Sequence, residues 1–523
     1  MNRLALLLAV AACGGSAPRV DPLAPPTSAG AKKLVVLLII DQLPAWAFAQ
    51  KQPALTQGFD RLLREGQWFT GVHPTPATLT AVGHALIGSG EPPSRTGILA
   101  NEWWDRPTAK MVFSVEGENG ALDAHRLRVP GLGDAVAAAK SGAKAVAVSL
   151  KDRAAILPLG HAGLALWYDK RQVRFVASAP AAWLPAYNTA HPVAAHLADV
   201  WTPLDAARLA ALSGSVDAER GEVGEKGFGP TFPHALAKTQ VPADAIFAAP
   251  VGNELVLDVA RAAIAGEHLG TDGSTDLLIV SLSAHDYVGH GWGHESWEAW
   301  DMMLRLDATL AAFMASLDAQ VGAGQWAMMV TSDHGASPMP ERLGGGRMQH
   351  DAIGAAANNA AATELGAGTW IARAKFPYLW FTPAFFQAKP VDRGKAMEKV
   401  LRALRAFPGI ARADRTATFA GGCAQRTGDA LAICMMIDPE RAGEVFFLPA
   451  PGWTMERADE PQATSHGSLH AYDREVPVIM LPFGRTPHAR GTAPEATMNM
   501  VRVATVIAGW LGVTPPTSLP APR

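Results

Sequence analysis

The chain has few cysteines, no excess of charge of either sign, and hardly any long apolar runs. Only 3 of its 523 residues are cysteine. No second Cys or His pair stands at ligand spacing near Cys423 and Cys434, which argues against a thiolate metal site. The 45 basic and 48 acidic residues give a net charge of −3. No overall field therefore recruits nucleic acid or an anionic membrane, we expect no nucleic-acid partner, and any anion must be bound by a local group of side chains.

Residues 1–13 contain the one export-like pattern of the sequence: a basic residue, a short apolar run and then small residues. The run is too short to span a bilayer, and no later stretch predicts a transmembrane segment. The end of the run resembles a bacterial lipobox, which predicts a lipid on Cys13; an ordinary signal peptide cleaved near Ala12 or Ala17 is the alternative. Residues 14–32, rich in Pro and Ala, would form a tether. We expect an exported protein, periplasmic or anchored in the outer membrane by that lipid alone.

The other two cysteines, Cys423 and Cys434, flank a turn-like stretch at 425–429. Because the periplasm is oxidising, we expect a disulfide that closes a hairpin here. Two buried thiols are the alternative, since Cys434 lies in the apolar run 431–437.

The remaining residues, 33–523, have a composition that can bury a large core, with 49% of the whole chain hydrophobic. Continuous apolar runs are typical of strands that are buried on both faces of a parallel sheet. Such runs occupy residues 33–40, 144–150, 276–281 and 326–330. Amphipathic segments predict helices at residues 53–65, 131–141, 252–267, 296–321 and 499–511. This alternation predicts an α/β fold, with a central, mostly parallel sheet and helices on both faces.

Two parts of this single predicted domain read as insertions, near residues 160–245 and 340–460. The first contains no recognisable chemistry, and we expect it to cap the site. Within the second, residues 344–366 are rich in Gly and Ala and predict a mobile loop or small excursion.

Polar side chains follow the apolar runs at the point where each predicted strand ends. The carboxyl ends of strands form the ligand crevice of doubly wound folds, so carboxylates and imidazoles placed there are candidate metal ligands. We predict two sets: Asp41, Asp333 and His334, completed by Thr80, and Asp286, His290 and His466. Nitrogen and oxygen ligands in near-tetrahedral number favour Zn²⁺ over Mg²⁺, and we expect two Zn²⁺ ions. Any one of these residues alone could be a polar loop residue or a satisfied core histidine; their joint placement after strands indicates metal.

Thr80 directly precedes the apolar run 81–88, which predicts a short helix with Thr80 at its N-terminus. Unpaired N–H groups and the helix dipole favour an anion at that position. Considered alone, Thr75, Thr78 and Thr80 could equally be turn and N-cap residues. With two ions nearby, however, the Thr80 hydroxyl could act as a nucleophile toward phosphorus. Three further side chains would neutralise the non-bridging oxygens: Asn101, Lys151 and Arg153.

Seven motifs occur in an order that resembles the alkaline phosphatase superfamily, above all the phosphate-irrepressible alkaline phosphatases with a Thr nucleophile. They are Asp41 after the first strand, T-x-x-G-H at 80–84, N-E-W-W-D at 101–105, K-x-R at 151–153, D-x-x-x-H at 286–290, S-D-H-G at 332–335 and H-G-S at 466–468. The resemblance implies an alkaline-phosphatase-like fold. It also implies that Asp41, Thr80, Asp333 and His334 hold one zinc, that Asp286, His290 and His466 hold the other, and that Asn101, Lys151 and Arg153 bind phosphoryl oxygens.

The chain departs from the family pattern at two positions. Val82 stands where the family often has Pro, and His470 adds an imidazole just after the H-G-S motif. We still assign the ligand to His466.

The K-x-R pair, Lys151 and Arg153, also bears on the substrate. A monoester dianion presents three charged non-bridging oxygens, whereas a diester has one fewer and carries a second organic group. By resemblance, the related nucleotide pyrophosphatase/phosphodiesterases lack this pair. The sequence therefore predicts hydrolysis of small-molecule phosphate monoesters through a phosphothreonine intermediate, by a monomer. Diesterase or phosphonate hydrolase activity is the alternative within the superfamily, and a non-catalytic metal-binding lipoprotein is the alternative of another class; against the latter, neither Thr80 nor any ligand has been lost.

Overall fold

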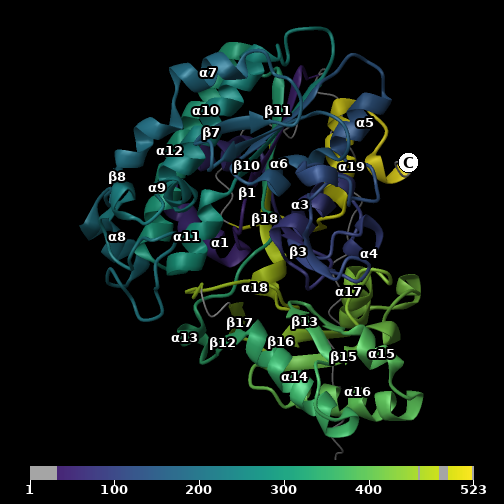
Figure 1. Cartoon of the computed structure of the whole chain (residues 1–523). Coiled ribbons are helices and arrows are strands. Elements are labelled where there is room, and N and C mark those ends of the chain that lie inside the picture. Colours follow the sequence, from purple (N-terminus) through teal and green to yellow (C-terminus); the bar gives the residue numbers. More distant parts are fainter. Residues whose placement is uncertain (1–31, 457–459, 482–492, 521–523) are drawn as a thin grey trace, which may run out of the picture.

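The computed structural model describes residues 32–456, 460–481 and 493–520 (Figure 1). The predicted export signal, the lipobox at Cys13 and nearly all of the tether at 14–32 lie outside these residues. Among the helices that are described, none is both long enough and apolar enough to cross a membrane.

A large mixed sheet forms the centre of the upper body in Figure 1. Its order in the described chain is β19-β2-β18-β11-β1-β10-β5-β6-β7. The strands are β1 (Leu34–Ile40), β2 (Gln67–Val72), β5 (Ala145–Ser149), β6 (Leu164–Asp169), β7 (Arg174–Ala177), β10 (Asp276–Leu282), β11 (Trp326–Thr331), β18 (Glu475–Leu481) and β19 (Thr497–Asn499). The central strands β11, β1, β10 and β5 run parallel, while β18 and β7 pair antiparallel with their neighbours. The predicted mostly parallel sheet is thus confirmed.

Strand β1 shows why the apolar runs are continuous. Every residue of β1 is buried, and the strand is paired on both sides. Val35, Leu37 and Ile39 pack into one hydrophobic layer, whereas Leu34, Val36 and Leu38 pack into the layer on the opposite face. Both faces must therefore be apolar, as expected for a sheet covered by helices on both sides.

Helices cover the two faces of this sheet, as predicted. The first layer takes residues from α3 (Thr80–Ser89), α5 (Leu132–Ala138), α6 (Asp152–Leu159) and α19 (Arg502–Leu511). The opposite layer takes residues from α1 (Ala45–Lys51), α2 (Gly58–Glu65), α10 (Pro250–Gly266), α11 (Ala284–Trp292) and α12 (Trp297–Leu317). The helix predicted over 53–65 is in fact a short 3-10 turn followed by α2, and residues 55–57 between them are not helical.

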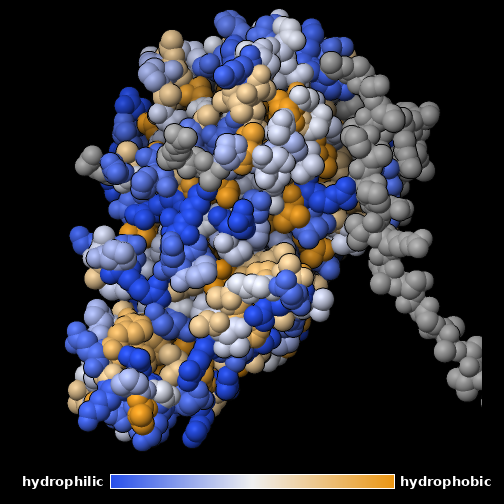
Figure 2. Space-filling view, turned by 90° about the vertical axis from the view of Figure 1, so that its right-hand side faces the viewer, coloured by the Kyte–Doolittle hydropathy of each residue, from blue (hydrophilic) through white to orange (hydrophobic). Residues whose placement is uncertain are grey.

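A second, antiparallel sheet lies at the lower end of the molecule in Figure 1, in the order β13-β14-β16-β15. Its strands are β13 (Ile371–Lys375), β14 (Tyr378–Phe381), β15 (Ile410–Arg415) and β16 (Val445–Pro449). Helices α14 (His350–Leu365) and α16 (Pro390–Arg405) pack together beside it. Figure 2 shows one face of the molecule, which is covered mainly by hydrophilic residues with hydrophobic ones scattered among them.

The prediction of a mobile loop at 344–366 is wrong. This stretch forms strand β12 (Gly346–Gln349) and then the 16-residue helix α14. Alanine is the best helix former, and Ile353, Ala357 and Ala361 recur at a spacing of four residues with fully buried side chains. The small alanine side chains let α14 pack closely against α16, so the composition indicated a packed helix.

Cys423 and Cys434 form a disulfide with a Cα–Cα distance of 5.6 Å, as expected. The predicted hairpin is absent: Cys423 begins a 3-10 turn, and Cys434 lies inside helix α17 (Gly428–Met436). The run 431–437 is apolar because all of its residues are buried or half-buried.

Candidate active site

The predicted site residues meet at the carboxyl ends of the central parallel strands. Asp41 directly follows β1, Lys151 comes soon after β5, and helix α11 with Asp286 and His290 follows β10. Asp333 and His334 follow β11, and both are fully buried. Because these strands are neighbours in the sheet, residues far apart in sequence lie side by side.

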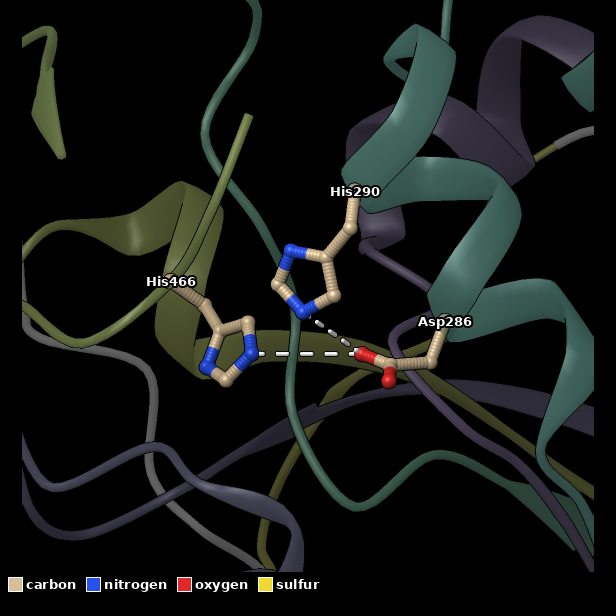
Figure 3. Close-up of side chains that lie close together, drawn as sticks. All are labelled: Asp286, His290 and His466. Atoms are coloured by element: carbon tan, nitrogen blue, oxygen red, sulfur yellow. Dashed lines mark ion pairs between the residues drawn. The ribbon is translucent and has the colours of Figure 1, made fainter. Parts of the chain in front are cut away.

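Asp286, His290 and His466 form one compact group (Figure 3). Oδ1 of Asp286 lies 3.2 Å from Nε2 of His290 and 3.9 Å from Nε2 of His466. The first two residues stand one turn apart on α11, while His466 reaches in from the loop before α18 (Ala471–Arg474). The three ligand-type atoms lie within 4.8 Å of one another, which is close enough to share one ion.

The imidazole rings of this group are held through their outer nitrogens. Nδ1 of His290 lies 3.0 Å from the carbonyl oxygen of Thr464, and Nδ1 of His466 lies 2.5 Å from that of Thr78. A carbonyl oxygen can only accept, so each Nδ1 carries the proton and donates it. In the neutral ring, each Nε2 then turns a lone pair toward Asp286, which is the arrangement that metal-binding histidines adopt.

A second group surrounds His334. Its Nε2 lies 3.6 Å from Oδ1 of Asp41 and 3.5 Å from Oδ2 of Asp333, while its Nδ1 donates to the carbonyl of Gly335 at 3.0 Å. These three facing atoms are buried and have no hydrogen-bond partner within the described residues. Asp286 belongs here as well, because ligand-type atoms of Asp41, Asp286 and His334 also lie within 4.8 Å of one another. Asp286 thus stands between the two groups.

The site holds more negative than positive charge. Nζ of Lys151 lies 2.6 Å from Oδ2 of Asp41 and 2.5 Å from Oδ2 of Asp286, and Asp333 is a third buried carboxylate. Burial, together with repulsion from Asp286 and Asp333, raises the pKa of Asp41 well above its ordinary value, and Lys151 offsets only part of this effect. Burial alone would also raise the pKa of Asp286, but the cation of Lys151 holds it well below the ordinary range. Buried ligand-type atoms that lack a hydrogen-bond partner among the described residues lie beside an excess of negative charge. These surroundings fit a divalent cation.

Thr80 is the first residue of helix α3, as predicted, and only 2% of it is exposed. The Ala81 N–H donates to Oδ1 of Asn101 at 2.9 Å, which leaves the Asn101 NH₂ as a donor beside the helix start. His84, one turn along, lies with Nδ1 2.8 Å from the Thr80 carbonyl and 3.2 Å from Oδ2 of Asp333. The contact from His84 to Asp333 therefore joins the first turns of the helix to the His334 group.

Arg153 lies at the junction of two adjoining cavities. One, of about 330 Å³, is lined by Asn101, Arg153, His290 and His466 and extends to Phe376 near the second sheet. The other, of about 510 Å³, is also lined by Arg153, together with Lys151 and Tyr287. The side chain of Arg153 is 15% exposed and forms an ion pair with Asp152 at 3.9 Å. An anionic group in the first cavity would meet its guanidinium.

Two residues in contact with the site were not predicted from the sequence. Gln42 contacts Asp286 and Asp333, and His84 contacts Thr80 and Asp333. The sequence contained an indication of both residues: Gln42 is a polar residue directly after a strand-terminal Asp, and His84 belongs to the T-x-x-G-H motif. His470, which the sequence places near the site, is absent from both ligand groups and packs its ring against Tyr472.

The fold and the site together define a class of protein: an α/β protein whose central parallel strands end in a buried cluster of carboxylates and imidazoles. Residues 35–473 match the family model described as type I phosphodiesterase / nucleotide pyrophosphatase. The chain belongs to this family.

Individual relatives are alkaline phosphatases by name. The chain is 34% identical over 358 residues to alkaline phosphatase PhoV of Synechococcus elongatus, covering 63% of this chain and 64% of that protein. It is 35% identical over 329 residues to alkaline phosphatase PafA of Elizabethkingia meningoseptica, covering 58% and 60%. The chain thus spans less than two thirds of the length of these curated relatives. A crystal structure of wild-type PafA superimposes with a TM-score of 0.82 at 25% identity, covering 94% of this chain and 98% of that one.

Proposed function

We propose that this protein is a phosphatase that hydrolyses small-molecule phosphate monoesters to an alcohol and inorganic phosphate. One observation carries the proposal: the start of helix α3, which holds Thr80, contacts through His84 a buried carboxylate–imidazole cluster that fits divalent cations. The alkaline phosphatases among its relatives support the same activity.

The residues that would hold the metal are Asp41, Thr80, Asp333 and His334 in one set and Asp286, His290 and His466 in the other. Their mixed nitrogen and oxygen donors favour zinc, and we propose two Zn²⁺ ions. When bound, such ions lower the pKa of a coordinated hydroxyl and stabilise charge on a leaving oxygen.

In the proposed reaction, the Thr80 hydroxyl oxygen attacks phosphorus, the bond to the ester oxygen breaks, and the alcohol leaves. Asn101 donates its free NH₂ to a non-bridging oxygen, while Arg153 and Lys151 offset the charge of the others. Water then cleaves the phosphothreonine and releases inorganic phosphate. The cavity that runs from His466 toward Phe376 leaves room for the alcohol.

Replacement of the nucleophile tests this proposal. We expect Thr80→Ala to lower monoester hydrolysis by several orders of magnitude, since covalent catalysis is lost, with little change in the unfolding midpoint. Thr78→Ala is a matched control, because Thr78 contacts His466 through its main-chain carbonyl, which the substitution keeps. Hydrolysis by Thr80→Ala at the rate of Thr78→Ala would contradict the proposal.

Phosphodiester hydrolysis is the second candidate, because the matching family model is named for phosphodiesterases. Arg153→Ala separates the two activities more cleanly than Lys151→Ala, since Lys151 also pairs with Asp41 and Asp286. If Arg153 serves a monoester dianion, its loss lowers kcat/KM for an aryl monoester at least tenfold more than for an aryl diester. Equal losses would count against the monoester assignment.

The remaining proposals follow from the sequence. We propose an exported protein, periplasmic or attached to the outer membrane through a lipid on Cys13, and acting as a monomer.

A further inference from the structure

Gln42, directly after Asp41, has an energetically unfavourable backbone conformation and a buried polar side chain. Its φ is +59°, in the left-handed region that glycine adopts more easily than any residue with a side chain. The residue is also completely buried. A long polar side chain in such a position must be held by contacts that offset both the strain and the loss of water.

Those contacts reach both proposed metal sets. The backbone N–H of Gln42 donates to Oδ1 of Asp333 at 3.1 Å. Its side-chain Nε2 donates to Oδ1 of Asp286 at 2.6 Å and lies 3.1 Å from Nε2 of His290. One residue therefore binds a carboxylate from each set.

The surroundings also fix which way the amide points. Nε2 of His294 lies 2.9 Å from Oε1 of Gln42, and an amide oxygen can only accept, so His294 donates. The Asp286 carboxylate can only accept, so it must face the Gln42 NH₂, and this turns Oε1 toward His294. Space for the amide exists because residue 289 is glycine; a Cβ there would collide with Oε1 of Gln42. The His294 ring stacks on His285 at 5.1 Å, which supports its orientation.

We propose that Gln42 is a positioning residue that sets the separation of the two metal sets, and that His294 fixes the orientation of its amide. The backbone of Gln42 holds Asp333, and its side chain holds Asp286, so movement of either carboxylate relative to the other breaks a hydrogen bond. This inference rests on the proposed function, because it assumes that both sets bind zinc.

Gln42→Gly distinguishes this role from that of a turn residue. Glycine removes the strain and the amide together, so if Gln42 served only to turn the chain, the variant would be as stable as the wild type or more stable. We expect the metal-free variant to keep an unfolding midpoint close to that of the wild type, because the relief of strain and the loss of buried hydrogen bonds oppose each other. We also expect it to lose half of its zinc at a chelator concentration at least tenfold lower than the wild type, measured by elemental analysis after dialysis against graded chelator.

Two control variants isolate the amide. Lys140→Gly removes a side chain from another left-handed position, at an exposed site outside both sets. Gln67→Ala removes a different buried glutamine, whose amide donates to Glu495. Both should retain zinc like the wild type. His294→Phe keeps an aromatic ring beside His285 but cannot donate, and its zinc retention should fall between that of the wild type and that of Gln42→Gly.

If Gln42→Gly retained zinc as well as the wild type, this inference would be overturned while the proposed function would stand. An equal loss of zinc in both controls would have the same consequence. A wild-type protein that retains no zinc and hydrolyses no monoester would overturn the proposed function, and this inference with it. The two failures are therefore distinguishable.

Discussion

At the scale of single residues, burial penalises the charged form of several histidines in this protein. His334 and His466 face carboxylates through Nε2, and burial lowers the pKa of both imidazoles. His73 has no place in the proposed chemistry: it is buried, its Nε2 donates to the carbonyl of Ser332 at 3.1 Å, and burial lowers its pKa to about 4. A substitution at His73 can therefore measure the free-energy cost of charging a buried imidazole.

We predict that His73 makes stability fall as the solution becomes acidic. Its ordinary pKa is about 6.5, so between about pH 6.5 and pH 4 the unfolded chain binds a proton that the folded chain does not. The contribution is complete above pH 6.5 and is lost as pH falls toward 4, at about 1.4 kcal/mol per pH unit. His73→Gln keeps a donor but cannot titrate. Its unfolding free energy is measured by urea denaturation with chelator present. The slope of this free energy against pH should be smaller than in the wild type by the equivalent of about one proton; an unchanged slope would contradict the prediction.

At the scale of elements, helix α3 is placed by close contact with the loop after β11. Gly83 lies against the backbone of Asp333, and a methyl group added there would collide with the Asp333 carbonyl oxygen. His84 adds a side-chain contact to the same aspartate. The absence of a side chain at residue 83 therefore brings the start of α3 close to the proposed metal set.

We predict that Gly83→Ala pushes α3 away from Asp333. The clash is with backbone, which cannot move aside, so we expect a loss of a few kcal/mol of stability and at least a hundredfold loss of monoester hydrolysis. Gly509→Ala is the matched control: it is also a helical glycine, in α19, but its Cβ would meet nothing within 4 Å. That control should be stabilised by about 0.5–1 kcal/mol with activity intact. Activity in Gly83→Ala equal to that of the control would show that the close contact is not needed.

At the scale of the whole molecule, the candidate active site lies where the two sheets approach each other. The cavity beside His290 and His466 is lined from one side by Asn101 and from the other by Phe376, which lies between β13 and β14 of the second sheet. Within the cluster, Asp41, Asp286 and Asp333 exceed the charge of Lys151. Bound cations would therefore join and stabilise segments from distant parts of the chain.

We predict that zinc raises the stability of the folded protein. A ligand that binds only the folded state at about one hundred times its Kd contributes about 2.7 kcal/mol per site. Removal of metal by a chelator should lower the unfolding midpoint and abolish hydrolysis, and added zinc should restore both. Asp286→Asn should lose most of the zinc-dependent rise in the unfolding midpoint, because this carboxylate stands between the two groups. A midpoint that does not respond to zinc in the wild type would contradict the prediction.

The sequence by itself determined the local elements. The apolar run at 33–40 had to be a strand covered on both faces, and the run after Thr80 had to be a short helix, because burial and periodicity act over neighbouring residues. The disulfide partners followed from the cysteine count and the expected oxidising compartment. Reasoning from local composition failed at 344–366, where glycine and alanine content predicted a loop but the segment forms helix α14 packed on α16.

The tertiary structure alone decided how the strand-end residues are spaced and which of them stands between the two predicted sets. Strands β11, β1, β10 and β5 are neighbours in the sheet but are not in sequence order, so only their pairing brings His334 beside Asp41 and places Asp286 between two groups. The same pairing sets Lys151 against two carboxylates and turns Gln42 toward both sets. Local patterns could not reveal these contacts, because they depend on the register of strands whose partners lie more than a hundred residues away.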